Sequence, residues 1–165
     1  MADWRRYFEG KRVWVTGASS GIGAAIADAL GTAGVRTLAS ARRTGPLEAL
    51  AQAHPSVSVL PLDLADTSLI AEAVTRAWDQ LGGIDVLVNN AGISQRSNFV
   101  DADPATLARV IEIDLLATMR LTHAVASRMV AQGSGHLVTV TSLAAKVPPP
   151  RRTAYAAAKA GLHGL

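Results

Sequence analysis

The sequence has no cysteine and few aromatic residues, which make up 4% of the chain. Without cysteine there is neither a disulfide framework nor a thiolate metal site, so a reducing, cytoplasmic environment is expected. The 16 lysines and arginines are scattered in short pairs along the chain and are not interleaved with aromatic side chains. In spite of the net charge of +3, this scatter argues against nucleic-acid binding and favours ordinary solvated charge.

Long hydrophobic runs are also missing. The first ten residues contain no apolar stretch typical of a signal peptide, and no later segment offers the ~18 consecutive apolar residues of a membrane-spanning helix. We therefore predict no association with a membrane. We also predict no metal site, because no ligand-type spacing relates the four histidines, which are His54, His123, His136 and His163.

The chain does contain short, β-branched apolar runs that alternate with longer alanine- and leucine-rich segments. Hydrophobic residues make up 49% of the sequence, and continuous apolar runs are typical of parallel strands covered on both faces. Strict alternation of the two patterns predicts an α/β fold with a doubly wound, parallel, Rossmann-type sheet. The expected strands are residues 12–16, 36–41, 57–61, 84–89 and 136–141, and the expected helices are residues 21–33, 45–53, 66–81 and two within 104–132.

A glycine-rich turn, Thr-Gly-Ala-Ser-Ser-Gly-Ile-Gly, follows the first expected strand at residues 16–23. In such a turn Gly17 permits the tight bend, Gly21 lets the backbone approach a pyrophosphate, and Gly23 allows the helix to pack closely on the strand. The helix N-terminus then offers free N–H groups to an anion. A plain strand-to-helix turn is the alternative. A kinase- or GTPase-type phosphate loop is excluded, because no Gly-Lys-Ser/Thr follows.

Tyr155 and Lys159 stand four positions apart in a segment expected to be helical, so their side chains share one face. A free tyrosine has a pKa of ~10, and a nearby ammonium group favours the phenolate that acid–base work requires. A buried tyrosine beside a surface lysine is the alternative. Ser142 follows the fifth expected strand, where open α/β sheets bind ligands, and its hydroxyl can both donate to and accept from a substrate oxygen.

Taken in order, these motifs resemble those of the short-chain dehydrogenases/reductases. The resemblance rests on the turn at 16–23, Asp63-Leu64 after the third strand, Asn-Asn-Ala-Gly at 89–92, and Ser142 followed after 13 positions by Tyr155 and then by Lys159. It extends from about residue 11 to residue 165. We therefore expect residues 1–165 to form a single dinucleotide-binding domain.

The resemblance implies a role for each matching residue. Tyr155 would exchange a proton with the substrate oxygen, Lys159 would assist it and bind the nicotinamide ribose, and Ser142 would position the substrate. Asp63 would reach the adenine. The other residues expected to bind the cofactor are Gly17, Ser19, Ser20, Gly21, Ile22 and Gly23 in the turn, Leu64 by its backbone, and Asn90, Ala91 and Gly92 beside the adenine ribose.

The end of the second strand predicts which cofactor is bound. NAD-binding domains place a carboxylate there for the ribose 2′-hydroxyl, whereas an arginine accommodates a 2′-phosphate. Here Ala41 replaces the acid and Arg42 follows it, with Ser40 and Arg43 available to assist. The cofactor is therefore predicted to be NADP(H), and solvated loop charge is the alternative for the two arginines.

Asp114 departs from the family pattern. Many members have an asparagine in the matching helix segment, where it holds a water that links the lysine to solvent. The resemblance places Asp114 among the catalytic residues, either ordering a water or pairing with Lys159. A structural aspartate is the alternative, since an ionised carboxylate cannot donate a hydrogen bond as an amide does.

These features predict an NADP(H)-dependent oxidoreductase that moves a hydride between the nicotinamide and a carbonyl or secondary alcohol substrate. A non-catalytic NADP(H)-binding module or an inactive fragment is the alternative, and a nucleotide-binding transferase would have no need of the Tyr-x-x-x-Lys pair. Family members continue through two more strands and a substrate-covering segment, and complete members are expected to be homodimers or homotetramers. We therefore expect this chain to be truncated, to lack the C-terminal strands, and by itself to be poorly stable and inactive.

Overall fold

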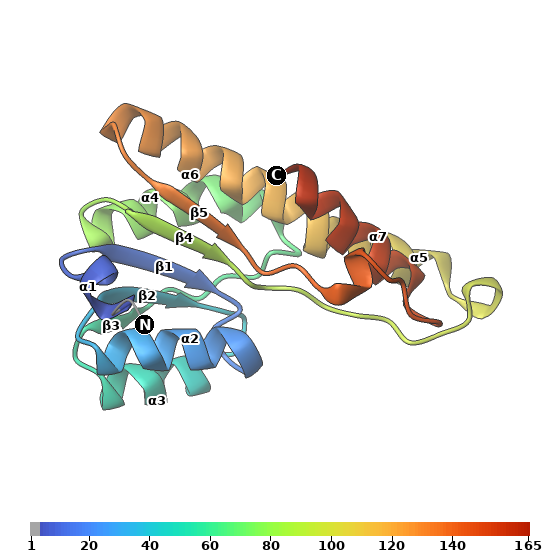
Figure 1. The fold of residues 1–165 in the computed structure, drawn as a ribbon, viewed down its shortest axis with the longest axis horizontal. Coiled ribbons are helices and arrows are strands. Elements are labelled where there is room, and N and C mark those ends of the chain that lie inside the picture. Colours follow the sequence, from blue (N-terminus) through green and yellow to red (C-terminus); the bar gives the residue numbers. More distant parts are fainter. Residues whose placement is uncertain (1–3) are drawn as a thin grey trace.

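The computed structural model describes residues 4–165 and contains one parallel sheet of five strands in the order β3-β2-β1-β4-β5. In Figure 1, α2 and α3 cover one face of this sheet, and α4 and α6 cover the other. The predicted α/β, doubly wound sheet is thereby confirmed. The strands are β1 (Arg12–Thr16), β2 (Arg36–Ser40), β3 (Val57–Val59), β4 (Val86–Asn89) and β5 (His136–Thr139).

The helices follow the predicted segments, with one addition at the start of the chain. The short helix α1 (Trp4–Phe8) was not predicted, and the segment 66–81 divides into a 3-10 turn at Thr67–Leu69 and α4 (Ile70–Leu81). The Asp66 side chain accepts a hydrogen bond from the Ser68 N–H and so begins that turn. The remaining helices are α2 (Gly21–Thr32), α3 (Gly45–Ala53), α5 (Pro104–Ile111), α6 (Thr118–Gln132) and α7 (Thr153–Gly161).

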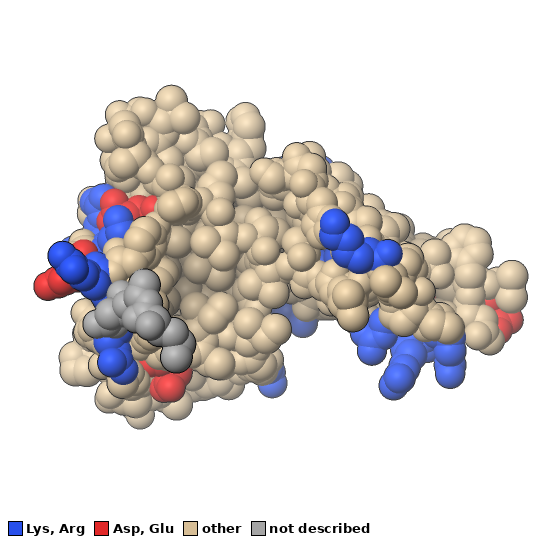
Figure 2. Space-filling view, viewed as in Figure 1, with Lys and Arg blue, Asp and Glu red and all other residues tan. Residues whose placement is uncertain are grey.

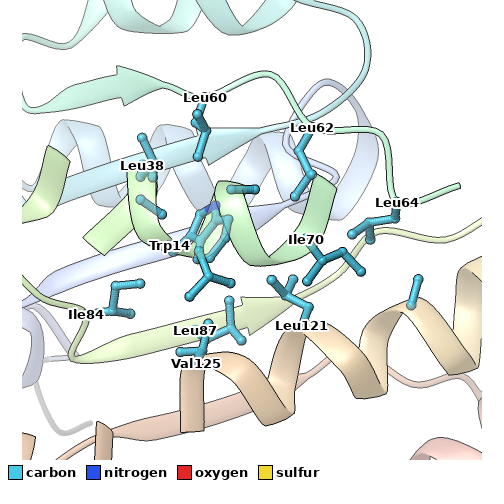
Figure 3. Packing of buried hydrophobic residues seen from close by; sticks show 14 of the residues in the cluster. Trp14, Leu38, Leu60, Leu62, Leu64, Ile70, Ile84, Leu87, Leu121 and Val125 are labelled. Carbon is cyan, nitrogen blue, oxygen red and sulfur yellow. The ribbon is translucent and has the colours of Figure 1, made fainter. Parts of the chain in front are cut away.

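Side chains of β1 alternate between two hydrophobic layers, as the pleat of a strand requires. Val13 and Val15 pack with α2 and α3, whereas Trp14 enters the other layer, against α4 and α6. Figure 3 shows Trp14 surrounded by leucine, isoleucine and valine side chains from several elements. Its indole Nε1–H donates to Ser40 Oγ at 2.8 Å, which satisfies the only polar atom of a fully buried ring.

A six-residue π-helix, Glu112–Ala117, joins α5 to α6. π-Helical turns inside α-helices are rare and are frequent at functional sites. In this one Asp114 has an exposed fraction of 0%, and it lies between α5, which packs on α7, and α6, which packs on β4. The wider turn thus places a carboxylate in the interior.

The outer strand β5 pairs with β4, and within residues 4–165 no strand pairs with its other edge. Its apolar side chains Leu137 and Val138 are 40% and 43% exposed. Within the described residues, this edge of the sheet is therefore open and apolar. At the start of this strand, the Tyr7 hydroxyl of α1 contacts His136 Nδ1.

The strand order determines where a ligand can bind. From β1 the chain moves outward to β2 and β3, then returns to the other side of β1 with β4 and β5. In open α/β sheets, ligands occupy the crevice beyond the carboxyl ends of the strands at such a reversal. Here that crevice lies beyond Thr16 of β1 and Asn89 of β4.

Candidate active site

A cleft of about 520 Å³ occupies this reversal point. Residues far apart in the sequence line it, from the turn after β1 to the first turns of α7. Most of the predicted site residues are among them. The lining includes Thr16, Gly17, Ser19, Ser20, Ile22, Ser40, Ala41, Arg42, Arg43, Leu62, Asp63, Leu64, Asn90, Ala91, Gly92, Ile93, Ser94, Ile113, Val140, Thr141, Arg152, Tyr155 and Lys159.

The glycine-rich turn packs directly on the segment that follows β4. Asn90 Nδ2 donates to the carbonyl oxygens of Thr16 and Gly17 at 3.0 and 3.3 Å, and the Ala91 N–H donates to Thr16 Oγ1 at 3.2 Å. A Cβ added to Gly17 would lie 2.7 Å from the Ala91 Cα, and one added to Gly23 would lie 2.3 Å from Asn90 Nδ2. Both glycines are therefore required by packing, and Gly23 lies behind the cleft wall.

Gly21 has a different reason to be glycine. Its φ of 57° lies in the left-handed region, and nothing lies within 4 Å of the position a Cβ would take. The neighbouring residues Ser19, Ser20 and Ile22 line the cleft, and Ile22 is 61% exposed. Ser20 is the N-cap of α2, yet its side chain makes no capping hydrogen bond. Backbone N–H groups at this helix end are thus available to an anion.

The end of β2 presents a basic edge to the cleft. Arg42 and Arg43 are exposed, and Arg43 Nη2 donates to Ser19 Oγ at 3.4 Å. Among residues 4–165, no carboxylate forms an ion pair with either arginine. Ser40 also lines the cleft, but it is buried and its hydroxyl accepts the bond from Trp14, so this hydroxyl already has a partner.

The loop after β3 forms the wall beside these arginines. Asp63 lines the cleft, and its Oδ1 accepts a hydrogen bond from the Ala65 N–H at 3.0 Å, which fixes the carboxylate against its own loop. Leu64 lines the cleft beside it, but the residue is only 5% exposed and belongs to the hydrophobic core. The carboxylate is therefore the polar side chain that this loop presents.

Tyr155 and Lys159 meet in the cleft from successive turns of α7. Lys159 Nζ lies 5.8 Å from the centre of the Tyr155 ring and donates to the Val140 carbonyl oxygen at 3.2 Å. The lysine is only 5% exposed, and no carboxylate within residues 4–165 pairs with it. A buried cation therefore lies beside the phenol, in the arrangement that the spacing of four predicts.

Ser142 lies next to the cleft but is not among its lining residues, where Val140 and Thr141 stand instead. Its hydroxyl accepts a hydrogen bond from the Ala144 N–H at 3.1 Å and caps the short 3-10 turn Leu143–Ala145. Because a hydroxyl keeps one O–H donor while it accepts, this cap leaves a donor for another oxygen.

The Asp114 carboxyl is buried behind the cleft wall formed by Ile93 and Ile113. Oδ1 accepts a hydrogen bond from the Ile93 N–H at 2.7 Å, while Oδ2 has no hydrogen-bond partner within residues 4–165. Burial raises the pKa of Asp114 to about 6, against the opposing effects of the Ile93 N–H bond and the charge of Lys159. The side chain thus titrates near neutral pH.

The raised pKa predicts a pH-dependent stability. Since folded Asp114 holds its proton up to about pH 6, whereas an unfolded aspartate loses it near pH ~3.9, the folded state loses stability as the pH rises through this window. In Asp114→Asn the amide oxygen can still accept from the Ile93 N–H, and the cost of the buried charge is gone. Relative to the parent, the free energy of unfolding of this variant should rise by about 2 kcal/mol between pH 4 and pH 7.5.

Urea titrations at several pH values measure this difference. Asp79→Asn is the matched control, because Asp79 is an exposed carboxylate on α4, and its difference from the parent should stay constant. A constant difference for Asp114→Asn as well would show that the Asp114 carboxyl does not carry the pH dependence.

Among the residues not predicted as site residues, Ser94, Arg152 and Thr141 bring polar groups to the cleft, and Gln95 lies beside it. Ser94 and Arg152 line the cleft and are joined by a hydrogen bond of 2.7 Å from Arg152 Nη1 to Ser94 Oγ. Thr141 also lines it. Gln95 is buried beside them, and its Oε1 accepts from the Tyr155 N–H at 3.3 Å. The only sequence signal for these residues is their position next to the Asn-Asn-Ala-Gly and Tyr-x-x-x-Lys motifs.

Two negative findings concern residues 4–165 alone. No helix in this range is both long and apolar enough to cross a membrane. Nor does the range contain a group of three or more histidine, aspartate or glutamate side chains that could hold a metal ion.

Comparison with known proteins agrees with the fold and the motifs. The model of the family described as short chain dehydrogenase matches residues 11–165, and the chain belongs to this family. Dehydrogenase/reductase SDR family member 7 of Homo sapiens is 39% identical over 161 residues, covering 93% of this chain and 48% of that protein. The chain spans about half the length of the curated relatives it matches.

Solved structures give the same result. A short-chain dehydrogenase from Streptomyces avermitilis has a TM-score of 0.89 and 37% identity, covering 94% of this chain and 58% of that one. A metagenomic short-chain oxidoreductase in complex with NADP has a TM-score of 0.86 and 37% identity, covering 93% and 72%. The predicted family is confirmed.

Proposed function

We propose that this protein is an NADP(H)-dependent oxidoreductase that transfers a hydride between the nicotinamide and a carbonyl or secondary alcohol substrate. The observation that best supports this is Tyr155 beside the buried Lys159, in one cleft with the glycine-rich turn. A phenol next to a cation is suited to proton exchange with a substrate oxygen, and the turn is suited to a dinucleotide.

The lining residues fit NADP(H). The open space above Gly21 and the uncapped start of α2 suit a pyrophosphate, and Asp63 lies on the wall expected to meet the adenine. Arg42 and Arg43 have no acidic partner within the described chain, and Ala41 supplies no carboxylate for a ribose 2′-hydroxyl. This basic edge favours a cofactor with a 2′-phosphate, as in the NADP complex of the metagenomic relative.

The bound nicotinamide would supply or accept the hydride. The chain's own work is then to move a proton at the substrate oxygen. In the reductive direction Tyr155 Oη donates its proton to the carbonyl oxygen, and the positive charge of Lys159 stabilises the phenolate that remains. The bond from Lys159 Nζ to the Val140 carbonyl holds that charge in place.

Ser142 and Asp114 would complete the reaction centre. The remaining O–H of Ser142 can donate to the substrate oxygen and so orient it. Asp114 Oδ2, which lacks a protein partner, can order a water that returns a proton towards Lys159. A structural role for Asp114, held by the Ile93 N–H, is the alternative.

A non-catalytic NADP(H)-binding module is the second candidate. It is favoured by one observation, the buried carboxyl of Asp114 at a position where many members of the family have an asparagine. In either case we propose that residues 1–165 act as one dinucleotide-binding unit. For the complete protein we propose assembly as a homodimer or homotetramer in the cytoplasm.

A panel of aldehydes, ketones and keto-acyl compounds tests the function. With NADPH present, at least one member should yield its alcohol in an amount equal to the NADPH oxidised, measured by absorbance and chromatography. A fluorescence titration with NADPH, taken together with the panel, separates the two candidates. Binding without oxidation of NADPH by any member would favour the non-catalytic module, and absence of binding would contradict both.

A further inference from the structure

Arg152 lies at the substrate end of the cleft, three positions before Tyr155. Its guanidinium carbon is 5.8 Å from the centre of the Tyr155 ring, and the residue is half-buried among the lining residues. The guanidinium therefore stands beside the phenol that is proposed to meet the substrate oxygen.

The position of Arg152 is fixed by its surroundings. Nη1 donates to Ser94 Oγ at 2.7 Å, and the adjacent Arg151 carbonyl accepts from the Ser97 N–H at 3.2 Å. The buried Gln95 side chain accepts from the Tyr155 N–H at 3.3 Å. These bonds tie the segment 94–97 to the start of α7, so little entropy is lost when a ligand contacts the guanidinium.

The charge of Arg152 is not neutralised by the protein. Within residues 4–165 no carboxylate forms an ion pair with it. A guanidinium carries five N–H donors in a planar fork, and the bond to Ser94 uses only one. A partly desolvated arginine without an acidic partner is suited to a carboxylate or phosphate, which accepts two parallel N–H bonds.

The surface around the cleft mouth adds to this field. Figure 2 shows lysine and arginine side chains gathered beside the loop that precedes α7. Lys146 and Arg151 are exposed on the segment that precedes Arg152. A concentration of one charge around a cleft attracts a ligand of the opposite sign.

We infer that Arg152 binds an anionic group of the substrate, a carboxylate or a phosphate monoester, while the reacting carbonyl lies at Tyr155. Ser94 would hold the guanidinium in place for that group, because its hydroxyl accepts from Arg152 and donates to the Gln95 carbonyl at 3.3 Å. The substrate class is then oxo acids or phosphorylated ketones, with the corresponding hydroxy compounds in the reverse direction. This inference rests on the proposed function and adds to it the residue that selects the substrate.

Matched pairs of ketones test the inference in a catalytically active form of the protein. The pairs are 4-oxopentanoate with its methyl ester, and dihydroxyacetone phosphate with dihydroxyacetone. For the preferred anion, the ratio of kcat/KM of the charged member to that of the neutral member should fall about tenfold or more in Arg152→Gln. Arg152→Lys, which keeps the charge but not the fork, should retain part of that ratio. The pair of ketones whose kcat/KM ratio falls in Arg152→Gln identifies the anionic group that Arg152 binds, either a carboxylate or a phosphate.

Arg96→Gln is the matched control, because Arg96 is exposed on the same loop as Ser94 but does not line the cleft. Arg96→Gln removes the same charge as Arg152→Gln. The ratio of kcat/KM for the charged ketone to that for the neutral ketone should stay within about twofold of the parent, since a solvent-exposed charge contributes little. Equal losses for charged and neutral ketones in Arg152→Gln, or an equal effect of Arg96→Gln, would overturn the inference.

A binding measurement makes the result independent of turnover. In the Tyr155→Phe background with NADP⁺ bound, calorimetry should detect 4-oxopentanoate or dihydroxyacetone phosphate, and adding Arg152→Gln should weaken that binding about tenfold or more. Equal binding with and without Arg152, or no binding of either anion, would overturn the inference. If the protein with Tyr155 intact still reduces neutral ketones, the proposed function stands and only the role of Arg152 is wrong.

Discussion

Tyr155→Phe should lower kcat by roughly 10²–10⁴-fold in a catalytically active form of the protein, because the change removes the group proposed to transfer a proton to the substrate oxygen. The ring itself stays, so the packing of α7 and the position of Lys159 should change little. Steady-state oxidation of NADPH with the best substrate measures the loss.

Two controls separate lost chemistry from lost structure. NADPH binding by Tyr155→Phe, followed by fluorescence, should stay within about twofold, since the phenolic oxygen is a minor part of the cofactor contact. Tyr7→Phe removes the same hydroxyl from the other tyrosine, which lies on α1 and contacts His136. That variant should keep its turnover, and a Tyr155→Phe enzyme within threefold of the parent would rule out Tyr155 as the proton donor.

Arg42→Ala should weaken NADPH binding roughly 10- to 100-fold and leave NADH binding almost unchanged, because a charge-assisted hydrogen bond to the 2′-phosphate contributes about 1.5–3 kcal/mol. Dissociation constants for both nucleotides, measured by fluorescence titration of the same preparation, give the two changes. The difference between them isolates the phosphate, since the two cofactors are otherwise identical.

Arg36→Ala is the control for this change. Arg36 begins the same strand at the opposite end, where its Nη2 donates to the Gln80 carbonyl. Its loss should affect NADPH and NADH equally. An equal weakening of both nucleotides by Arg42→Ala would mean that another residue holds the 2′-phosphate or that the cofactor is NAD(H).

Hydrophobic patterning predicts the sheet correctly but places several strand ends too far along the chain. Leu60 and Ala41 are buried and continue the apolar runs of β3 and β2, yet both lie beyond the paired residues of their strands. Apolar runs report burial, whereas strand ends depend on where the neighbouring backbone stops pairing. The helix α1 has only five residues, too few to produce a periodic signal.

The site could be predicted as far as local motifs extend. Tyr155 and Lys159 come together because a single helix carries both, and that spacing is visible in the sequence. Arg152 and Ser94 meet only through the tertiary fold, so no local pattern indicates their contact. The π-helix at Glu112–Ala117 likewise gives no periodic signal, and with it the burial of Asp114 could not be foreseen.

The hydrogen bond between Trp14 and Ser40 has an optical consequence. The Trp14 indole is fully buried, and it is bonded to a residue that lines the cleft, whereas Trp4 is 43% exposed. Indole emission depends on the polarity around the ring and is quenched by energy transfer to a reduced nicotinamide nearby. Trp14 is therefore an intrinsic fluorophore one hydrogen bond away from the cleft lining, and it allows ligand entry to be followed in real time without an attached dye.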